Sequence, residues 1–326
     1  MDELNTNTRL PVPIQNTSLV RVNKSISITN KLLLGGIEEL FNQAFLLLNS
    51  ADKLNPKINF YHLIEMEPHY LIRCKFKRYS NTEDYYFKAL ELLEKVIEIH
   101  PRHYQSYDLR GIAFIGLKRY SDSEHEFSQA LKINTEDAFA FKFRGNAKHG
   151  LKDYEGAIED YTKATEIDQN YAFAFLDRGK AKVHMGDYVK ANADYTKASE
   201  IDTNCVDAFY WRGINKCSAL KDFEGGIVDL TKASEIESNY ARAYYACGLA
   251  KLILKKYEVA IDDFTKALNL GHNIAATLKH RGDAKSNLKD YKSAIADYNK
   301  ALEIEPNNER VLTNMKRAME KLKEIQ

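Results

Sequence analysis

The sequence predicts an all-α solenoid, in which helix-turn-helix repeats stack in a row, and two periodic series of small residues are the main evidence. The first series is a set of glycines at steps of 34, 34, 34, 35 and 34 residues: Gly111, Gly145, Gly179, Gly213, Gly248 and Gly282. The second is a set of alanines with the same period: Ala130, Ala164, Ala198, Ala233, Ala267 and Ala301. A period near 34 residues indicates a solenoid of stacked supersecondary units.

The segment 138–171 illustrates how one repeat is built. Its first half carries Phe141, Gly145 and Ala147. Its second half carries apolar and small residues three and four positions apart, which is typical of one face of a helix: Tyr154, Ala157, Ile158, Tyr161, Ala164 and Ile167. The polar stretch "LKDY" joins the two halves. Each repeat is therefore predicted to be helix, turn, helix, and Gly145 and Ala157 should let the two helices approach closely.

The pattern divides the chain into four parts. Residues 1–30 are polar and are expected to be a flexible N-terminal arm, and 31–103 resemble degenerate repeats. Six regular repeats fill 104–308, and together with the degenerate repeats before them they give about eight helical hairpins. Residues 309–326 should form a C-terminal capping helix, because terminal repeats must present one side to water. One repeat is a residue longer near 218–221, which we interpret as a loop insertion, with a local change in groove curvature as the alternative.

The repeat resembles the tetratricopeptide repeat, whose pattern is W-x2-L-G-x2-Y, then A-x3-F, then P. Here the repeat at 138–171 reads F-x2-R-G-x2-K, followed by A-x3-Y at Ala157 and Tyr161. The leucine and the downstream tyrosine of the pattern are mostly replaced by Arg and Lys. The resemblance implies a right-handed superhelix whose first helices line a concave groove that binds a segment of another protein.

Composition limits the function classes. Lys and Arg number 47 and Asp and Glu 46, so the net charge is +1, and we do not expect a nucleic-acid partner. Four cysteines with no C-x-x-C spacing predict reduced thiols and a cytoplasmic protein. The apolar stretches are too short to span a membrane, and no signal peptide is evident.

The sequence also lacks recognisable catalytic motifs. It contains no G-x-S-x-G, phosphate-binding loop, G-x-G-x-x-G or H-E-x-x-H pattern. His100 and His103 are the one close histidine pair, without a cysteine or carboxylate cluster beside them. We therefore predict a protein that is not an enzyme and that has no metal and no cofactor.

Five repeats carry an Arg-Gly pair whose arginine needs an explanation. Arg144 and Lys148 lie four positions apart, so they share the stripe of Gly145, which faces the second helix. A charge that points there needs a partner. The second helices offer an acid at a fixed position: Glu126, Asp160, Asp194, Asp229, Asp263 and Asp297. We predict a repeated Arg–carboxylate bridge between helices, with Cys247 replacing the arginine in one repeat.

The resemblance places the partner-binding groove on the first helices. Ten residues are predicted to line it: Phe139, Lys142, Asn146, Phe173, Leu176, Lys180, Tyr210, Ile214, Tyr245 and Leu249. Further groove positions hold His149, Leu252, Ile253, Lys279 and Asp283. Exposed apolar patches and tyrosines are typical of partner sites. Self-association, as in a homodimer, or internal cover of the same strip remains open.

The predicted function is a non-catalytic protein–protein interaction scaffold that holds a peptide or protein segment in this groove. RNA binding by the helical repeats is an alternative, and acids near the inner face, such as Asp177 and Asp207, argue against it. A structural homo-oligomer is the other alternative. Acids at these two positions also argue against a clamp for a C-terminal carboxylate.

Overall fold

The computed structural model describes residues 39–48 and 82–325. All regular secondary structure in these residues is helical: one helix over 39–48 and fourteen more, α3 to α16. The predicted all-α fold of consecutive helix pairs is thereby confirmed. The predicted arm over 1–30 lies outside the described residues, as does much of the segment 31–103. Contacts divide the chain into two compact units, Met1–Ile133 and Asn134–Gln326.

The N-terminal unit contains the helix over 39–48 followed by α3 (Thr82–Ile99), α4 (Tyr104–Gly116) and α5 (Tyr120–Ile133). Helix α3 packs on α4, and α4 packs on α5. Its core is built from large side chains that are fully buried, including Leu93, Ile112 and Phe127. The α4/α5 pair is the first regular repeat of the sequence.

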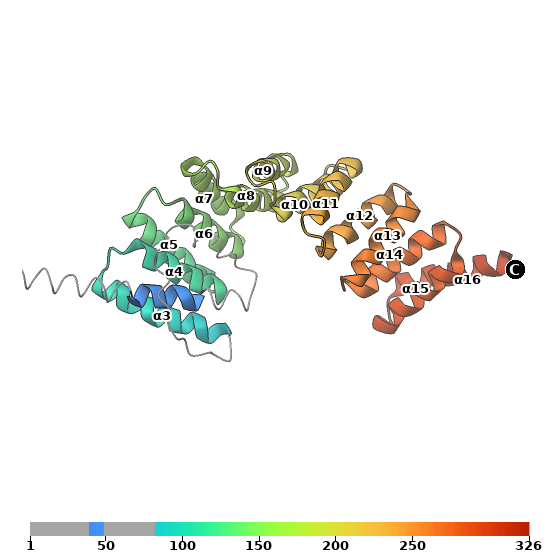
Figure 1. Ribbon diagram of the computed structural model, residues 1–326, viewed down its shortest axis with the longest axis horizontal. Coiled ribbons are helices and arrows are strands. Elements are labelled where there is room, and N and C mark those ends of the chain that lie inside the picture. The colour runs from blue at the N-terminus through green and yellow to red at the C-terminus, as the bar shows by residue number, and fades with distance from the viewer. Residues whose placement is uncertain (1–38, 49–81, 326) are drawn as a thin grey trace, which may run out of the picture. The chain divides into compact units, whose positions relative to one another are not determined.

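The C-terminal unit is a run of five helix pairs and a final helix. The pairs are α6 (Ala138–Gly150) with α7 (Tyr154–Ile167), α8 (Ala172–His184) with α9 (Tyr188–Ile201), α10 (Val206–Ser218) with α11 (Phe223–Ile236), α12 (Ala241–Ile253) with α13 (Tyr257–Asn269), and α14 (Ile274–Asn287) with α15 (Tyr291–Ile304). Helix α16 (Glu309–Ile325) follows. The pairs succeed one another from green to red in Figure 1. The first helices of successive pairs also contact each other, as α10 contacts both α8 and α12.

Close contact between the two helices of a pair depends on the periodic glycines. A methyl group on Gly145 would lie 2.7 Å from Cε1 of the Tyr161 ring, which itself is 1% exposed. Gly179 meets Tyr195, and Gly282 meets Tyr298, in the same way. The ring of the second helix therefore fills the space that any side chain at the glycine would need, and the expected close approach is confirmed.

The turns within the pairs are short and similar to one another. After α6, Lys152 takes a positive φ of 67° and the Asp153 side chain accepts a hydrogen bond from Gly156 N, 3.0 Å away, at the start of α7. Between α10 and α11 the turn runs from residue 219 to 222, one residue more than between α6 and α7. Lys221 still has a positive φ, and Asp222 still caps the next helix. The extra residue is thus a turn insertion, as predicted.

The predicted Arg–carboxylate bridges are present. Arg144 donates from Nε and Nη2 to Asp160, at 2.8 and 2.7 Å, and Lys148 Nζ lies 3.0 Å from the same carboxylate. The same bidentate pairing joins Arg110 to Glu126, Arg178 to Asp194, Arg212 to Asp229 and Arg281 to Asp297. Each acid is almost fully buried, so the paired cations supply the partners that a buried charge requires.

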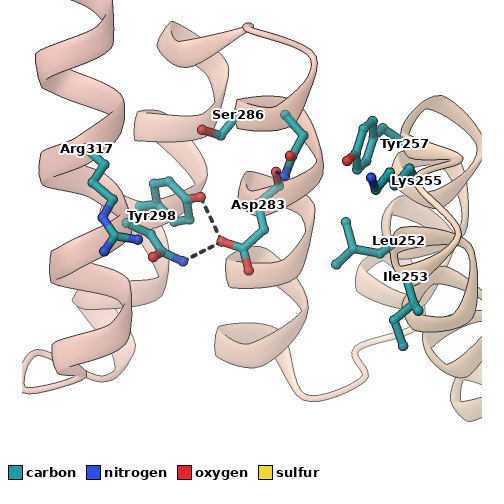
Figure 2. A pocket seen from close by; sticks show the side chains of 10 residues that line it. Leu252, Ile253, Lys255, Tyr257, Asp283, Ser286, Tyr298 and Arg317 are labelled. Carbon is teal, nitrogen blue, oxygen red and sulfur yellow. Dashed lines mark hydrogen bonds between the residues drawn. The ribbon is translucent and has the colours of Figure 1, made fainter.

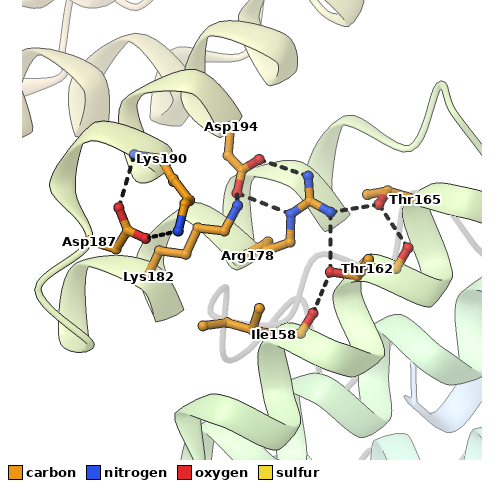
Figure 3. A network of polar contacts seen from close by, with 8 residues as sticks. All are labelled: Ile158, Thr162, Thr165, Arg178, Lys182, Asp187, Lys190 and Asp194. Carbon is orange, nitrogen blue, oxygen red and sulfur yellow. Dashed lines mark hydrogen bonds and ion pairs between the residues drawn. The ribbon is translucent and has the colours of Figure 1, made fainter.

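The arginines also reach the preceding helix pair, a contact that the repeat pattern does not predict. Arg178 Nη1 donates to Thr162 Oγ1 and Thr165 Oγ1 of α7, at 3.2 and 3.0 Å (Figure 3). Arg212 makes equivalent bonds to Thr196 and Ser199 of α9. One guanidinium therefore ties three helices together.

Helix α16 closes the C-terminal unit by packing on α15. Val311 and Ala318 are each 1% exposed, and Met315 packs against the same cluster. Farther along, Met319 is 45% exposed. No helix within the described residues is both long and apolar enough to cross a membrane.

Candidate partner-binding face

The predicted groove residues lie on the first helices α6, α8, α10 and α12, and their surface, continued by α14 and α16, is called the first-helix face below. The ten side chains differ in exposure. Leu176 is 1% exposed and packs among Ala191, Tyr195 and Ala208, so it belongs to the core. The prediction that Leu176 lines the groove is corrected on this ground, because a side chain inserted between helix pairs offers no surface. Phe139, at 9%, is also largely buried against Phe143.

The α6/α8 end of the face is polar. Asp177 pairs with Lys142 Nζ at 3.1 Å and with Lys180 Nζ at 2.9 Å. Burial alone would raise the pKa of Asp177, but the two lysines hold it well below its usual range. Asn146 accepts a hydrogen bond from the Tyr161 hydroxyl at 2.8 Å. The acid that argued against an anionic ligand is therefore already neutralised by two lysines.

The middle of the face is aromatic and aliphatic. Tyr210 makes edge contacts with Trp211 and Tyr240, both with ring centroids 5.3 Å apart. Tyr210 and Ile214 pack with one side against the buried cluster of Leu230, Ala246 and Cys247. All these contacting residues lie in α10, α11 and α12 or just before α12. The strip is thus held rigidly by the core while each side chain keeps part of its surface accessible.

Tyr245 and Leu249 continue this strip on α12, and both are half-buried. The Tyr245 ring lies 5.0 Å from His272 and 6.0 Å from His280, measured between centroids. Burial raises the pKa of Tyr245 and of Tyr210, so both hydroxyls stay protonated at neutral pH. Both can serve as neutral hydrogen-bond donors beside apolar rings.

A cavity of about 440 Å³ lies at the α12/α14/α16 end of the face. Its lining comes from five helices, α12 to α16, and one turn: Leu252, Ile253, Lys255, Tyr257, Asp283, Ser286, Asn287, Tyr298, Asn314 and Arg317. Figure 2 shows Leu252, Ile253, Lys255 and Tyr257 on one side, Arg317 on the other, and Asp283 between them. Its volume falls in the range of ordinary ligand pockets.

Asp283 organises the base of this cavity. Its carboxylate accepts hydrogen bonds from the Tyr298 hydroxyl and from Asn314 Nδ2, each at 2.8 Å, and Lys279 Nζ lies 2.8 Å away. Burial would raise the pKa of Asp283, but His280, Lys279 and Tyr298 lower it well below its usual range. The residue therefore seats α15 and α16 against α14 as a charged but fully engaged acid.

Leu252, Ile253 and Asp283 occupy groove positions of the repeat pattern, but the opposite wall of the cavity does not follow from that pattern. Asn314 and Arg317 lie in the capping helix, outside the periodic repeats, and Lys255 lies in a turn. Val311, Met315 and Met319 lie four positions apart on one face of α16, and this spacing indicates only that the face packs. Among the described residues, no group of three or more His, Cys, Asp or Glu could hold a metal ion.

Three segments match models of the tetratricopeptide repeat: residues 145–186, 241–270 and 275–308. No curated protein matches the chain. Among solved structures, YrrB, a TPR protein with an unusual peptide-binding site, is 23% identical with a TM-score of 0.53, over 58% of this chain and 97% of YrrB.

Two further solved structures share the fold. The Cut9–Hcn1 hetero-tetramer of APC/C is 19% identical over 88% of this chain and 55% of that chain, with a TM-score of 0.55. The C-terminal part of a TPR repeat-containing protein from Cytophaga hutchinsonii is 17% identical over 71% and 94%, with a TM-score of 0.59. The matched segments show that the chain contains tetratricopeptide repeats, and the solved structures share its fold.

Proposed function

We propose that this protein is a scaffold that holds an extended segment of a partner protein on the first-helix face of its C-terminal unit. The observation that carries the proposal is the continuity of this face: a half-buried apolar strip on α10 and α12 leads into the cavity between α12, α14 and α16. Repeat proteins of this kind commonly bind partners along such extended surfaces. The peptide-binding site of YrrB supports the proposal by analogy of fold.

The chemistry of the strip favours a protein partner. Tyr210 and Tyr245 are rigid aromatic side chains with an apolar ring and a neutral hydroxyl, which suits the centre of a protein interface. Because the core already holds the strip in place, little side-chain conformational entropy would be lost when a partner binds. The lysines at the α6/α8 end are occupied by Asp177, so the face offers no uncompensated basic track for a nucleic acid there.

The test is affinity capture from the native cell with three forms of the chain. The first is wild type, and the second is Tyr210→Ala/Tyr245→Ala. The third is a control, Tyr188→Ala/Val228→Ala, which removes exposed side chains of α9 and α11. A protein that binds wild type and the control but not the Tyr210/Tyr245 variant supports the proposal. Identical partners for all three folded forms would place binding elsewhere.

A further inference from the structure

Positive charges outnumber negative charges in the lining of the cavity. Three lining residues are charged, Lys255, Asp283 and Arg317. The Asp283 carboxylate is already bound by Lys279, Tyr298 and Asn314. Within the described part of the chain, the side chains of Lys255 and Arg317 have no ion-pair partner. The cavity therefore presents two uncompensated positive charges to a ligand.

These two cations stand on opposite walls. Lys255 follows α12 and Arg317 belongs to α16, with Asp283 of α14 between them (Figure 2). A chain that crosses α14 would pass between the cations, within reach of either one. An Arg guanidinium suits a carboxylate particularly well, because it can donate two parallel hydrogen bonds.

One wall is also apolar. Leu252 and Ile253 lie beside Lys255, and Ile253 is 58% exposed. Covering it would remove apolar surface from water at the same time as the charge is neutralised. The Asp283 carboxylate at the base would repel a densely charged phosphate chain, and the aliphatic wall suits an apolar side chain. Both features therefore favour an acidic peptide over a phosphate chain.

We infer that this cavity recognises an acidic side chain of the bound segment together with an adjacent aliphatic side chain. The inference rests on the proposed function and adds a selectivity to it: partners should carry Asp or Glu next to Leu, Ile or Val. Lysines recur at the turn position of Lys255, at Lys118, Lys152, Lys221 and Lys289. What distinguishes Lys255 is Arg317 on the facing helix and the aliphatic pair beside it.

The experiment uses an array of random heptapeptides with blocked ends, probed with the full chain. The test variant is Lys255→Gln/Arg317→Gln. The control is Lys152→Gln/Arg310→Gln, which removes the same charge from an equivalent turn and from another site on α16. Wild type and the control should select peptides with an acid beside an aliphatic residue, and the test variant should lose the preference for the acid.

The strongest acidic peptide is then compared with its amide counterpart, Asp→Asn or Glu→Gln, by fluorescence anisotropy. We expect wild type to bind the acidic form at least about tenfold more tightly, and the test variant to bind both forms alike. A wild type without acid preference, a test variant that keeps it, or an array that binds nothing would each overturn the inference. Peptides that lack acid preference yet are lost in Tyr210→Ala/Tyr245→Ala would leave the scaffold function standing.

Discussion

The neighbouring helix pairs α10/α11 and α12/α13 contain the same buried aspartate in two different environments. In α10/α11, Asp229 receives two hydrogen bonds from Arg212, at 2.9 and 2.6 Å, and Lys216 lies 2.8 Å away. In α12/α13, Cys247 replaces the arginine, and within the described residues Asp263 forms an ion pair with Lys251 alone, at 2.6 Å. Both carboxylates are under 10% exposed. Asp229 is thus a buried acid with two cationic partners, and Asp263 is the equivalent acid with one.

Loss of the arginine also changes its surroundings. Arg212 lies over the Phe209 ring, 5.3 Å from its centroid, and reaches Thr196 and Ser199 of the preceding pair. In the Cys247 pair, Lys266 takes the face of Tyr244 at 5.3 Å, and Thr231 meets only the Cys247 sulfur at 3.8 Å. Burial raises the pKa of Asp263, since a single lysine does not offset it. The link between α11 and α12 therefore lacks the guanidinium–hydroxyl bonds by which Arg212 joins α10 to α9.

The largest expected effect comes from removing the acid. Asp229→Asn keeps the side-chain shape but leaves Arg212 and Lys216, both mostly buried, facing a neutral amide. We expect a loss of about 3 kcal/mol in the free energy of unfolding. Asp263→Asn is the matched change, and it should cost about 1 kcal/mol or less, because one cation is affected and burial already disfavours the charge. Urea unfolding followed by circular dichroism measures both, and equal losses would contradict the comparison.

An arginine at position 247 should make the α12/α13 pair as well bonded as the α10/α11 pair and so stabilise the protein. Cys247→Arg places a guanidinium where Asp263 lacks a second partner and where Thr231 can accept a hydrogen bond. We expect a gain of about 1 kcal/mol, since charged hydrogen bonds form while some core packing around Cys247 is lost. Cys247→Met, which adds length without charge, is the control and should give no gain. A methionine variant as stable as the arginine variant would show that packing alone decides.

Wild type and Cys247→Arg should also differ in how their stability depends on pH. Because the folded pKa of Asp263 is raised above its unfolded value of 3.8, the folded wild type binds the extra proton first. The contribution of Asp263 to the free energy of unfolding of wild type therefore falls as pH rises from about 4 through the raised pKa. In Cys247→Arg the new cation removes this loss, so the stability gap between the variant and wild type should widen from pH 4 to pH 7. A gap that stays constant over this range would contradict the assigned cause.

Contacts within one repeat could be predicted from the sequence, whereas contacts between repeats could not. The period identifies Gly145 against Tyr161 and Arg144 against Asp160, because both contacts lie within one repeat at a fixed separation. The exception at Cys247 is visible for the same reason. The bond from Arg178 to Thr162 was missed, although a "TKA" triplet recurs through the second helices. Contacts between repeats depend on the rotation from one pair to the next, which the period does not determine.

The same limit explains the errors at the candidate site. Leu176 occupies a groove position of the repeat pattern, yet it turns between pairs against Tyr195. The cavity needs Arg317 and Asn314, which come from a helix without the periodic signature. Tyr210 and Tyr245 lie at groove positions of the repeat and have the residue type that partner sites favour, and their role in binding a partner is a prediction.

The smallest expected effect tests the link between consecutive pairs. Thr265 Oγ1 accepts from Arg281 Nη1 at 3.1 Å and also donates to the Ile261 carbonyl. Thr265→Val keeps the shape and removes the acceptor, which should lower the free energy of unfolding by about 0.5–1 kcal/mol, because water can replace part of the lost bond. Thr231→Val, at the pair with Cys247, should have almost no effect. In Cys247→Arg the same Thr231→Val change should cost as much as Thr265→Val does. If it does not, the restored arginine pairs with Asp263 without joining α11 to α12.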